Sequence, residues 1–260
     1  MFNDITGEVV MDKKFLKYNL FVSLGEDCAC TSYLRDCKLQ FASFPFDWLT
    51  HASFEKRIEL VCNNFKDFLN FNDLYNLNFE KNPDIHFDSY GNKSTDFYHY
   101  HDFAPGVPLD ESYPDVKAKY DRRIKRFYRE IKTAKEILFV WFSRDKKLSD
   151  EQLKSALSKL NEKFPNKKID LLILENNFDM TNKNIEEYQI SENITKYIFD
   201  NKTFCTNNPL DECMGNKELT YKIFNKYAIK LSIIKSCSII IKKIFLNLIP
   251  SRKLRNKIRG

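Results

Sequence analysis

The chain has 260 residues, of which 43% are hydrophobic and 15% aromatic, with only 6 glycines and 8 prolines. This length and composition exclude a collagen, a low-complexity protein or a wholly disordered chain, and they allow a packed core of enzyme size. The net charge of +6 is unevenly spread, because 11 lysines and arginines but no acidic residue follow Glu218. The chain therefore has a mildly acidic body and a strongly basic tail.

In the first third of the chain, strand and helix patterns alternate. Residues 19–24 form an apolar run of strand length that ends at Gly25, and residues 28–36 then have helical spacing. The aromatic residues 41–49 are interrupted by Pro45, which indicates a short strand or an ordered loop. Ser53 is a cap for a helix whose apolar side chains extend to Phe65. The Asn- and Asp-rich residues 66–96 are expected to form an irregular insertion.

The second part of the body is more regular. A helix is predicted from about Pro114, with apolar side chains at helical intervals up to Ile131, and residues 136–142 indicate a buried strand. Ser149 and Gln152 form a capping box for a helix, which residues 169–176 follow as a second buried strand. Apolar strands alternating with helices predict an α/β fold with a layered, mostly parallel sheet flanked by helices. We expect this domain to cover residues 1–215, with a basic helical tail at 216–260.

Within the tail, residues 228–250 are rich in Ile and Leu but contain four lysines. A lysine at the centre of a membrane-spanning helix costs about 2.5–3.5 kcal/mol, so a membrane span is not expected. The pattern suits a helix that lies on an anionic membrane surface, or one that packs on the body and ends in a frayed basic segment. The tail has no motif typical of nucleic-acid binding, so no nucleic acid is expected as a partner.

The seven cysteines form no CxxC pair and have no regular spacing, which fits neither a zinc site nor a disulfide framework. The first residues contain acids and lack a long apolar segment, so they do not read as a secretory signal. We therefore expect a cytoplasmic protein without a metal ion or cofactor.

Cys28 occupies the position of a nucleophile. In a parallel sheet, sites collect at the carboxyl ends of the strands, and residues 23–28, 143–147 and 175–177 all fall there. The unpaired N–H groups of a helix N-terminus favour the reactive thiolate form of a cysteine. Glu26 and Asp27 oppose it, since they disfavour a further negative charge nearby.

A nucleophilic cysteine also needs a base, and two of the four histidines lie in DFYHYHDF at 96–103. If this segment is an extended strand, His99 and His101 point to one face and Asp102 to the other. One of the two histidines would then reach Cys28. The alternative is that both are ordinary polar residues of an aromatic loop.

The run VSLGEDCACTSYLRDCKLQFASFPFDWL, from Val22 to Leu49, resembles the opening of a bacterial family catalogued as papain-like cysteine peptidases of unknown function. The resemblance rests on a strand ending in SLG, a cysteine three residues after that glycine, a PFDW element and HDF at 101–103. It implies a cysteine-dependent hydrolase or acyltransferase, with Cys28 as nucleophile and His101 as base. Asp102, Asp145 and Asn176 are candidates to orient the histidine. A papain-like α+β fold is the alternative architecture.

The substrate implied is a glycan or a peptide, because relatives are associated with bacterial surface-polysaccharide biosynthesis. Candidates for binding it are side chains of the PFDW element, the second histidine and two arginines: Asp47, Trp48, His99, Arg122 and Arg144. Asp47 could instead close a turn, Trp48 could lie in the core and Arg122 on a solvated helix face. The alternative function is a peripheral-membrane transferase or binding protein of glycan assembly, at the inner face of the cytoplasmic membrane, in which Cys28 only packs.

Overall fold

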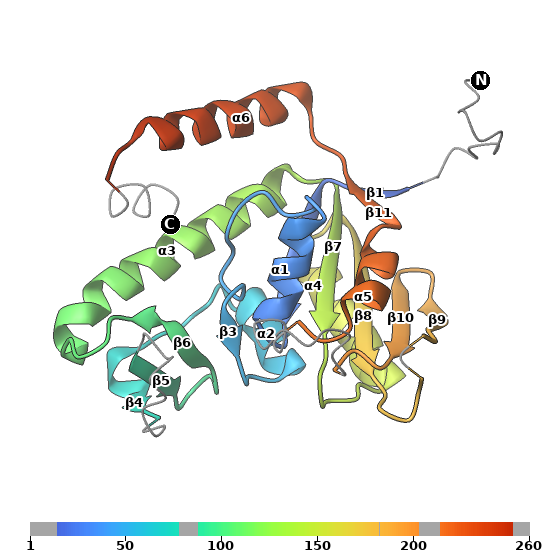
Figure 1. Ribbon diagram of the computed structural model, residues 1–260, viewed down its shortest axis with the longest axis horizontal. Helices are drawn as coiled ribbons and strands as arrows, with labels where there is room; N and C mark the ends of the chain where they lie inside the picture. The colour runs from blue at the N-terminus through green and yellow to red at the C-terminus, as the bar shows by residue number, and fades with distance from the viewer. Residues whose placement is uncertain (1–14, 78–87, 182, 203–213, 252–260) are drawn as a thin grey trace.

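The computed structural model describes residues 15–77, 88–181, 183–202 and 214–251, which fold as a mixed α/β protein (Figure 1). Its largest sheet has five strands in the order β2-β7-β8-β10-β9, and every neighbouring pair is parallel except β10 and β9. The strands are β2 (Leu20–Gly25), β7 (Glu136–Phe142), β8 (Lys168–Asn176), β9 (Glu186–Ser191) and β10 (Ile194–Phe199).

Helices cover both faces of this sheet. Alternate side chains of β2 point to opposite faces, so Leu20 and Val22 enter one core cluster and Phe21 enters the other. The first cluster also contains side chains of α2 (Phe54–Cys62), α3 (Leu109–Thr133) and α4 (Asp150–Lys163), and the second contains side chains of α1 (Cys28–Asp36) and α5 (Lys217–Phe224). The predicted α/β class is confirmed at this level.

Two smaller sheets complete the described structure. The first is antiparallel, with the strand order β3-β6-β5-β4, and contains β3 (Leu49–Thr50), β4 (Leu74–Asn76), β5 (Asp88–Asn92) and β6 (Tyr98–Phe103). A short 3₁₀ helix, Phe71–Asp73, precedes β4. The second is a parallel pair of β1 (Leu16–Tyr18) and β11 (Tyr227–Ile229), two strands that are far apart in the sequence.

Several predicted elements differ in their bounds. The helix predicted from Pro114 begins at Leu109, so Pro114 lies inside α3 and deprives its early turns of one N–H donor. The predicted insertion at 66–96 contains the 3₁₀ helix, β4 and β5, and its residues 78–87 lie outside the described residues. α5 and β11, which fall in the predicted tail, pack on the body through Leu219, Ile223 and Tyr227.

The last helix, α6 (Ile233–Leu248), lies alongside α3 (Figure 1). Its Leu246 is buried, and Lys235 forms an ion pair of 2.7 Å with Glu130 of α3. In the described part of the chain, no helix combines the length and the apolar content that crossing a membrane requires.

Candidate active site

Cys28 is the first residue of α1, directly after the loop that follows β2, and its side chain is half-buried. Gly25 makes the turn between the two elements, with a φ of +93° that side chains rarely adopt. A Cβ atom at this position would also lie 2.6 Å from Nη1 of Arg57. Glycine is therefore needed for the turn that delivers Cys28 to the helix N-terminus.

The two acidic residues before Cys28 hold this loop in place. Asp27 is the N-cap of α1, where its carboxylate accepts a hydrogen bond of 2.9 Å from the Ala29 N–H. It also accepts one of 3.0 Å from Nε of Arg144. The Glu26 carboxylate accepts a hydrogen bond of 2.9 Å from the Arg144 N–H. The acids thus fasten the loop to the segment after β7, and Arg144, predicted to bind substrate, lies largely buried between the loops.

A buried arginine connects this loop to the antiparallel sheet. Arg57 of α2 is fully buried and donates hydrogen bonds to the carbonyl oxygens of Glu26 (3.0 Å), Leu49 (3.3 Å) and Ala52 (3.3 Å). Burial lowers the pKa of its guanidinium to about 9. Leu49 pairs with His99 across β3 and β6, so Arg57 and Leu49 connect the Cys28 loop to His99 through three successive contacts.

Arg57 was missed by sequence reasoning, although a signal for it exists. It follows Phe54 by three residues and precedes Ile58, so it lies on the apolar face of α2. Three aromatic rings surround its guanidinium, namely those of Phe46, Phe97 and Trp141. A single arginine on an otherwise apolar helix face is therefore the pattern that could have identified it.

His99 of β6 is held by a carboxylate. Its side chain is fully buried, and Nδ1 lies 2.7 Å from Oδ2 of Asp102. The Tyr120 hydroxyl donates a hydrogen bond of 2.6 Å to the same oxygen, and Lys119 pairs with the other one. Among the described residues, Nε2 of His99 is buried and has no hydrogen-bond partner.

The charges around Asp102 favour its ionised form. Burial alone would raise the pKa of this carboxyl, but the hydrogen bond from His99 and the charge of Lys119 keep that pKa well below its usual range. Burial and the charge of Asp102 raise the pKa of Tyr120 well above its ordinary value. An ionised Asp102 favours a proton on Nδ1 of His99, which leaves Nε2 as the acceptor of the neutral ring.

The structure separates the two histidines that were predicted to share a face. Tyr90 of β5 pairs with His99, whereas Asp88 pairs with Phe103, so β6 has extra residues at a bulge between these pairs. A bulge breaks the alternation of side chains along a strand. As a result His101 is exposed, and Asp102 lies on the side of His99 rather than opposite to it.

The PFDW element closes a turn on α1. Asp47 is fully buried and accepts hydrogen bonds from the Phe44 N–H (2.9 Å), Nε2 of Gln40 (2.8 Å) and Nη2 of Arg35 (3.3 Å). Burial raises the pKa of Asp47, although the positive charge of Arg35 acts to lower it. The Arg35 guanidinium also lies 5.0 Å from the ring centre of the half-buried Trp48. These contacts give Asp47 and Trp48 a role in the local packing.

Arg122, the remaining candidate for substrate binding, lies on α3 and is half-buried. Its Nε is buried without a hydrogen-bond partner among the described residues. The same part of the chain contains no group of His, Cys, Asp and Glu side chains that could hold a metal ion.

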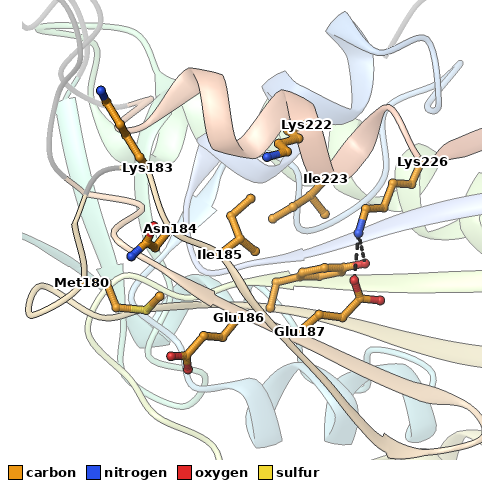
Figure 2. A pocket seen from close by; sticks show the side chains of 10 residues that line it. Met180, Lys183, Asn184, Ile185, Glu186, Glu187, Lys222, Ile223 and Lys226 are labelled. Carbon is orange, nitrogen blue, oxygen red and sulfur yellow. Dashed lines mark hydrogen bonds and ion pairs between the residues drawn. The ribbon is translucent and has the colours of Figure 1, made fainter.

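The described structure has two cavities elsewhere. Neither Cys28 nor His99 is among the residues that line them. The first has a volume of about 550 Å³ and lies beside β9, β10 and α5 (Figure 2). There Nζ of Lys226 contacts a carboxylate oxygen of Glu187 at 2.8 Å and the Tyr197 hydroxyl at 2.9 Å. Lys226 and Glu187 of this cavity thus form an ion pair with each other. The second cavity lies between α3 and α6.

Residues 19–180 match the family described as "Putative papain-like cysteine peptidase (DUF1796)", which is more than half of the chain. The chain belongs to this family. It is also similar to "Uncharacterized protein R408" of Acanthamoeba polyphaga mimivirus, with 29% identity over 208 residues, or 71% of this chain and 90% of the relative. No solved structure matches the chain.

Family membership, predicted from the SLG and PFDW elements, is confirmed, whereas a bacterial origin stays a prediction because the relative found is viral. The region that matches the papain-like cysteine peptidase family contains Cys28, His99, His101 and Asp102. It ends before β9, so β9, β10, α5, β11 and α6 lie outside the matched residues.

Proposed function

We propose that the protein is a cysteine-dependent hydrolase or acyltransferase in which Cys28 is the nucleophile. Membership in the papain-like cysteine peptidase family supports this reaction class. Cys28 has the right position, because the N-terminus of α1 carries partial positive charge that stabilises a thiolate. Arg144 pairs with Asp27, which reduces the opposing effect of that carboxylate on Cys28.

The observation that carries the proposal is the buried His99, held at Nδ1 by Asp102 and unpartnered at Nε2. A carboxylate that orients an imidazole and stabilises its protonated form is the supporting part of a Cys-His catalytic group. We therefore assign the base to His99 rather than to His101, which is exposed and lies within the bulge. Asp102 keeps its predicted role of orienting the histidine.

In the proposed reaction, Nε2 of His99 takes the proton from the Cys28 thiol, and the thiolate attacks the carbonyl carbon of an ester or amide. The leaving group takes the proton from His99, and water or a second acceptor then releases the acyl group. The Glu26 and Ala29 amides do not serve the oxyanion, because they already donate to the Phe142 carbonyl (3.0 Å) and to Asp27. The positive end of α1 supplies the stabilisation instead.

The test is to trap the acyl-enzyme. Purified full-length protein is incubated with p-nitrophenyl esters and with a peptide mixture, and the intact mass is followed by mass spectrometry. We expect an acyl adduct on Cys28 that is absent in Cys28→Ser and slowed by a factor of about 100 or more in His99→Gln. The matched control is His101→Gln, which keeps adduct formation. An adduct that forms equally fast in His99→Gln would remove His99 from the mechanism.

A second candidate function is contact with an anionic membrane surface through α6. The residues of one face of α6, spaced at i, i+4 and i+7, are large, apolar and exposed: Ile233, Ile234, Ile240, Ile241, Ile244, Phe245 and Leu248. A helix that only packs on a soluble body turns its apolar face inward. Apolar side chains that face outward beside lysines suit the interface of an anionic lipid leaflet.

Co-sedimentation with vesicles tests this contact. Full-length protein should bind vesicles that contain phosphatidylglycerol, and Phe245→Asp should abolish the binding. Phe178→Asp is the matched control, because Phe178 is as exposed as Phe245 but lies outside α6. Equal binding by all three proteins would contradict the membrane contact. The nature of the substrate, glycan or peptide, and a role in surface-polysaccharide biosynthesis stay predictions.

A further inference from the structure

The second cavity lies between α3, α6 and the turn at 40–43, and its volume is about 540 Å³. This size falls in the range of small-molecule binding sites, about 300–1,000 Å³. The lining side chains include five cationic groups from three elements: Arg35 of α1, Arg126 and Arg129 of α3, and Lys235 and Lys242 of α6.

The positive charge of this cavity exceeds the negative charge. Glu130 is the one acidic side chain among the lining residues, and it already accepts contacts from Nη2 of Arg129 at 3.0 Å and Nζ of Lys235 at 2.7 Å. Of these two contacts, the one from Lys235 joins α6 to α3, whereas Arg129 and Glu130 both belong to α3. Arg35 also pairs with the buried Asp47, so the five cations face two carboxylates and the cavity keeps a net positive charge.

Two of the cations carry an electrostatic cost. Burial and the neighbouring charges of Arg123 and Arg129 lower the pKa of Arg126. Burial and the charges of Arg126 and Arg129 lower the pKa of Lys242. Like charges that repel one another inside a cavity are stabilised when an anion binds between them.

We propose that this cavity binds a phosphate-bearing ligand. Arginine side chains offer planar pairs of N–H groups that match phosphate oxygens, while Lys242 adds a point charge. Ser43 and Asn247 also line the cavity and offer neutral hydrogen-bonding groups. The phosphate can come from a soluble ester or from a lipid headgroup, since the opposite face of α6 is apolar and exposed. None of the cations belongs to the proposed Cys28 and His99 machinery.

The experiment uses the full-length protein and two probes. Inorganic pyrophosphate is titrated by calorimetry at low salt, and phosphatidylcholine vesicles are compared with and without phosphatidic acid. The variants are Lys242→Gln and Arg129→Gln, whose side chains are exposed enough to be replaced without loss of folding. Lys222→Gln is the matched control, because Lys222 is exposed and lines the other cavity.

Binding of pyrophosphate that weakens about tenfold in each variant but not in Lys222→Gln supports the proposal with a soluble ligand, since each variant loses one charge-assisted hydrogen bond. Binding only to vesicles with phosphatidic acid, with the same dependence on the variants, supports it with a lipid ligand. Phe245→Asp distinguishes binding in the cavity from contact of the apolar face of α6 with lipid. Phe245 does not line the cavity, so this variant should leave pyrophosphate binding unchanged. No binding of either probe, or equal weakening in Lys222→Gln, would overturn the proposal.

Discussion

The buried carboxylate that holds His99 gives the sharpest stability prediction. Replacing Asp102 by Asn keeps the size of the side chain but removes its charge. The side chain of Asp102 is 3% exposed and accepts contacts from His99, Tyr120 and Lys119. An asparagine offers one acceptor oxygen in place of two, and its amide nitrogen then faces a donor.

The expected cost follows from these contacts. A hydrogen bond to a charged group contributes about 1.5–3 kcal/mol, and removing one partner of a buried ion pair costs about 3–5 kcal/mol. Lys119 is partly exposed, which reduces the cost because water takes over part of its interaction. We therefore expect Asp102→Asn to lower the free energy of unfolding by about 3 kcal/mol at pH 7.

Chemical denaturation of the full-length protein measures this change, and pH gives a second signature. Because the pKa of Asp102 is lower in the folded than in the unfolded state, its contribution is present above about pH 4 and is lost progressively as the pH falls further. The difference between wild type and variant should therefore shrink below about pH 4. The control is Asp121→Asn. Asp121 forms an exposed ion pair with Lys117, which contributes about 0.5 kcal/mol to the free energy of unfolding. Equal costs for both variants would refute the assignment.

The turn glycines, the cysteines and the buried arginine give further tests. Gly25→Ala should lower the free energy of unfolding by about 3 kcal/mol or more, because the Arg57 guanidinium occupies the place of the new Cβ atom. Gly106→Ala, where φ is +71° and nothing lies near the new atom, should lower it by about 1 kcal/mol. Equal shifts of the two variants in thermal unfolding would be inconsistent with this. Burial raises the pKa of the Cys30 thiol to about 12. Peptide mapping after iodoacetamide treatment at pH 8 should therefore find Cys30 unmodified and the exposed Cys237 alkylated. Alkylation of Cys30 but not of Cys237 would contradict this prediction. Arg57→Met should lower the Tm by about 10 °C, because three carbonyl groups lose their donor, and a shift below about 3 °C would argue against this role.

Local patterns were sufficient to predict the elements around Cys28. The apolar run of β2, the glycine after it and the helical spacing of α1 are all encoded within 18 residues, and the structure confirms this strand, turn and helix. The capping box of Ser149 and Gln152 is likewise confirmed. These features depend on neighbours in the sequence, so one chain is enough to read them.

Features that depend on partners distant in the sequence were not predictable in the same way. The bulge in β6 arises from its pairing with β5, and this bulge places Asp102 on the same side as His99. Arg144 meets Asp27 across 117 residues, and no local pattern indicates that this arginine holds a loop. The basic residues of the tail predicted contact with an anionic surface, which stays a prediction, whereas the cavity depends on how α6 lies on α3.

The most direct test of the central claim is the pH dependence of Cys28 alkylation, followed peptide by peptide with iodoacetamide. A nucleophile paired with His99 should react with an apparent pKa well below the free value of about 8.5, and His99→Gln should return it to that value while His101→Gln does not. An ordinary apparent pKa in the wild type, unchanged in His99→Gln, would contradict catalysis by Cys28 and His99.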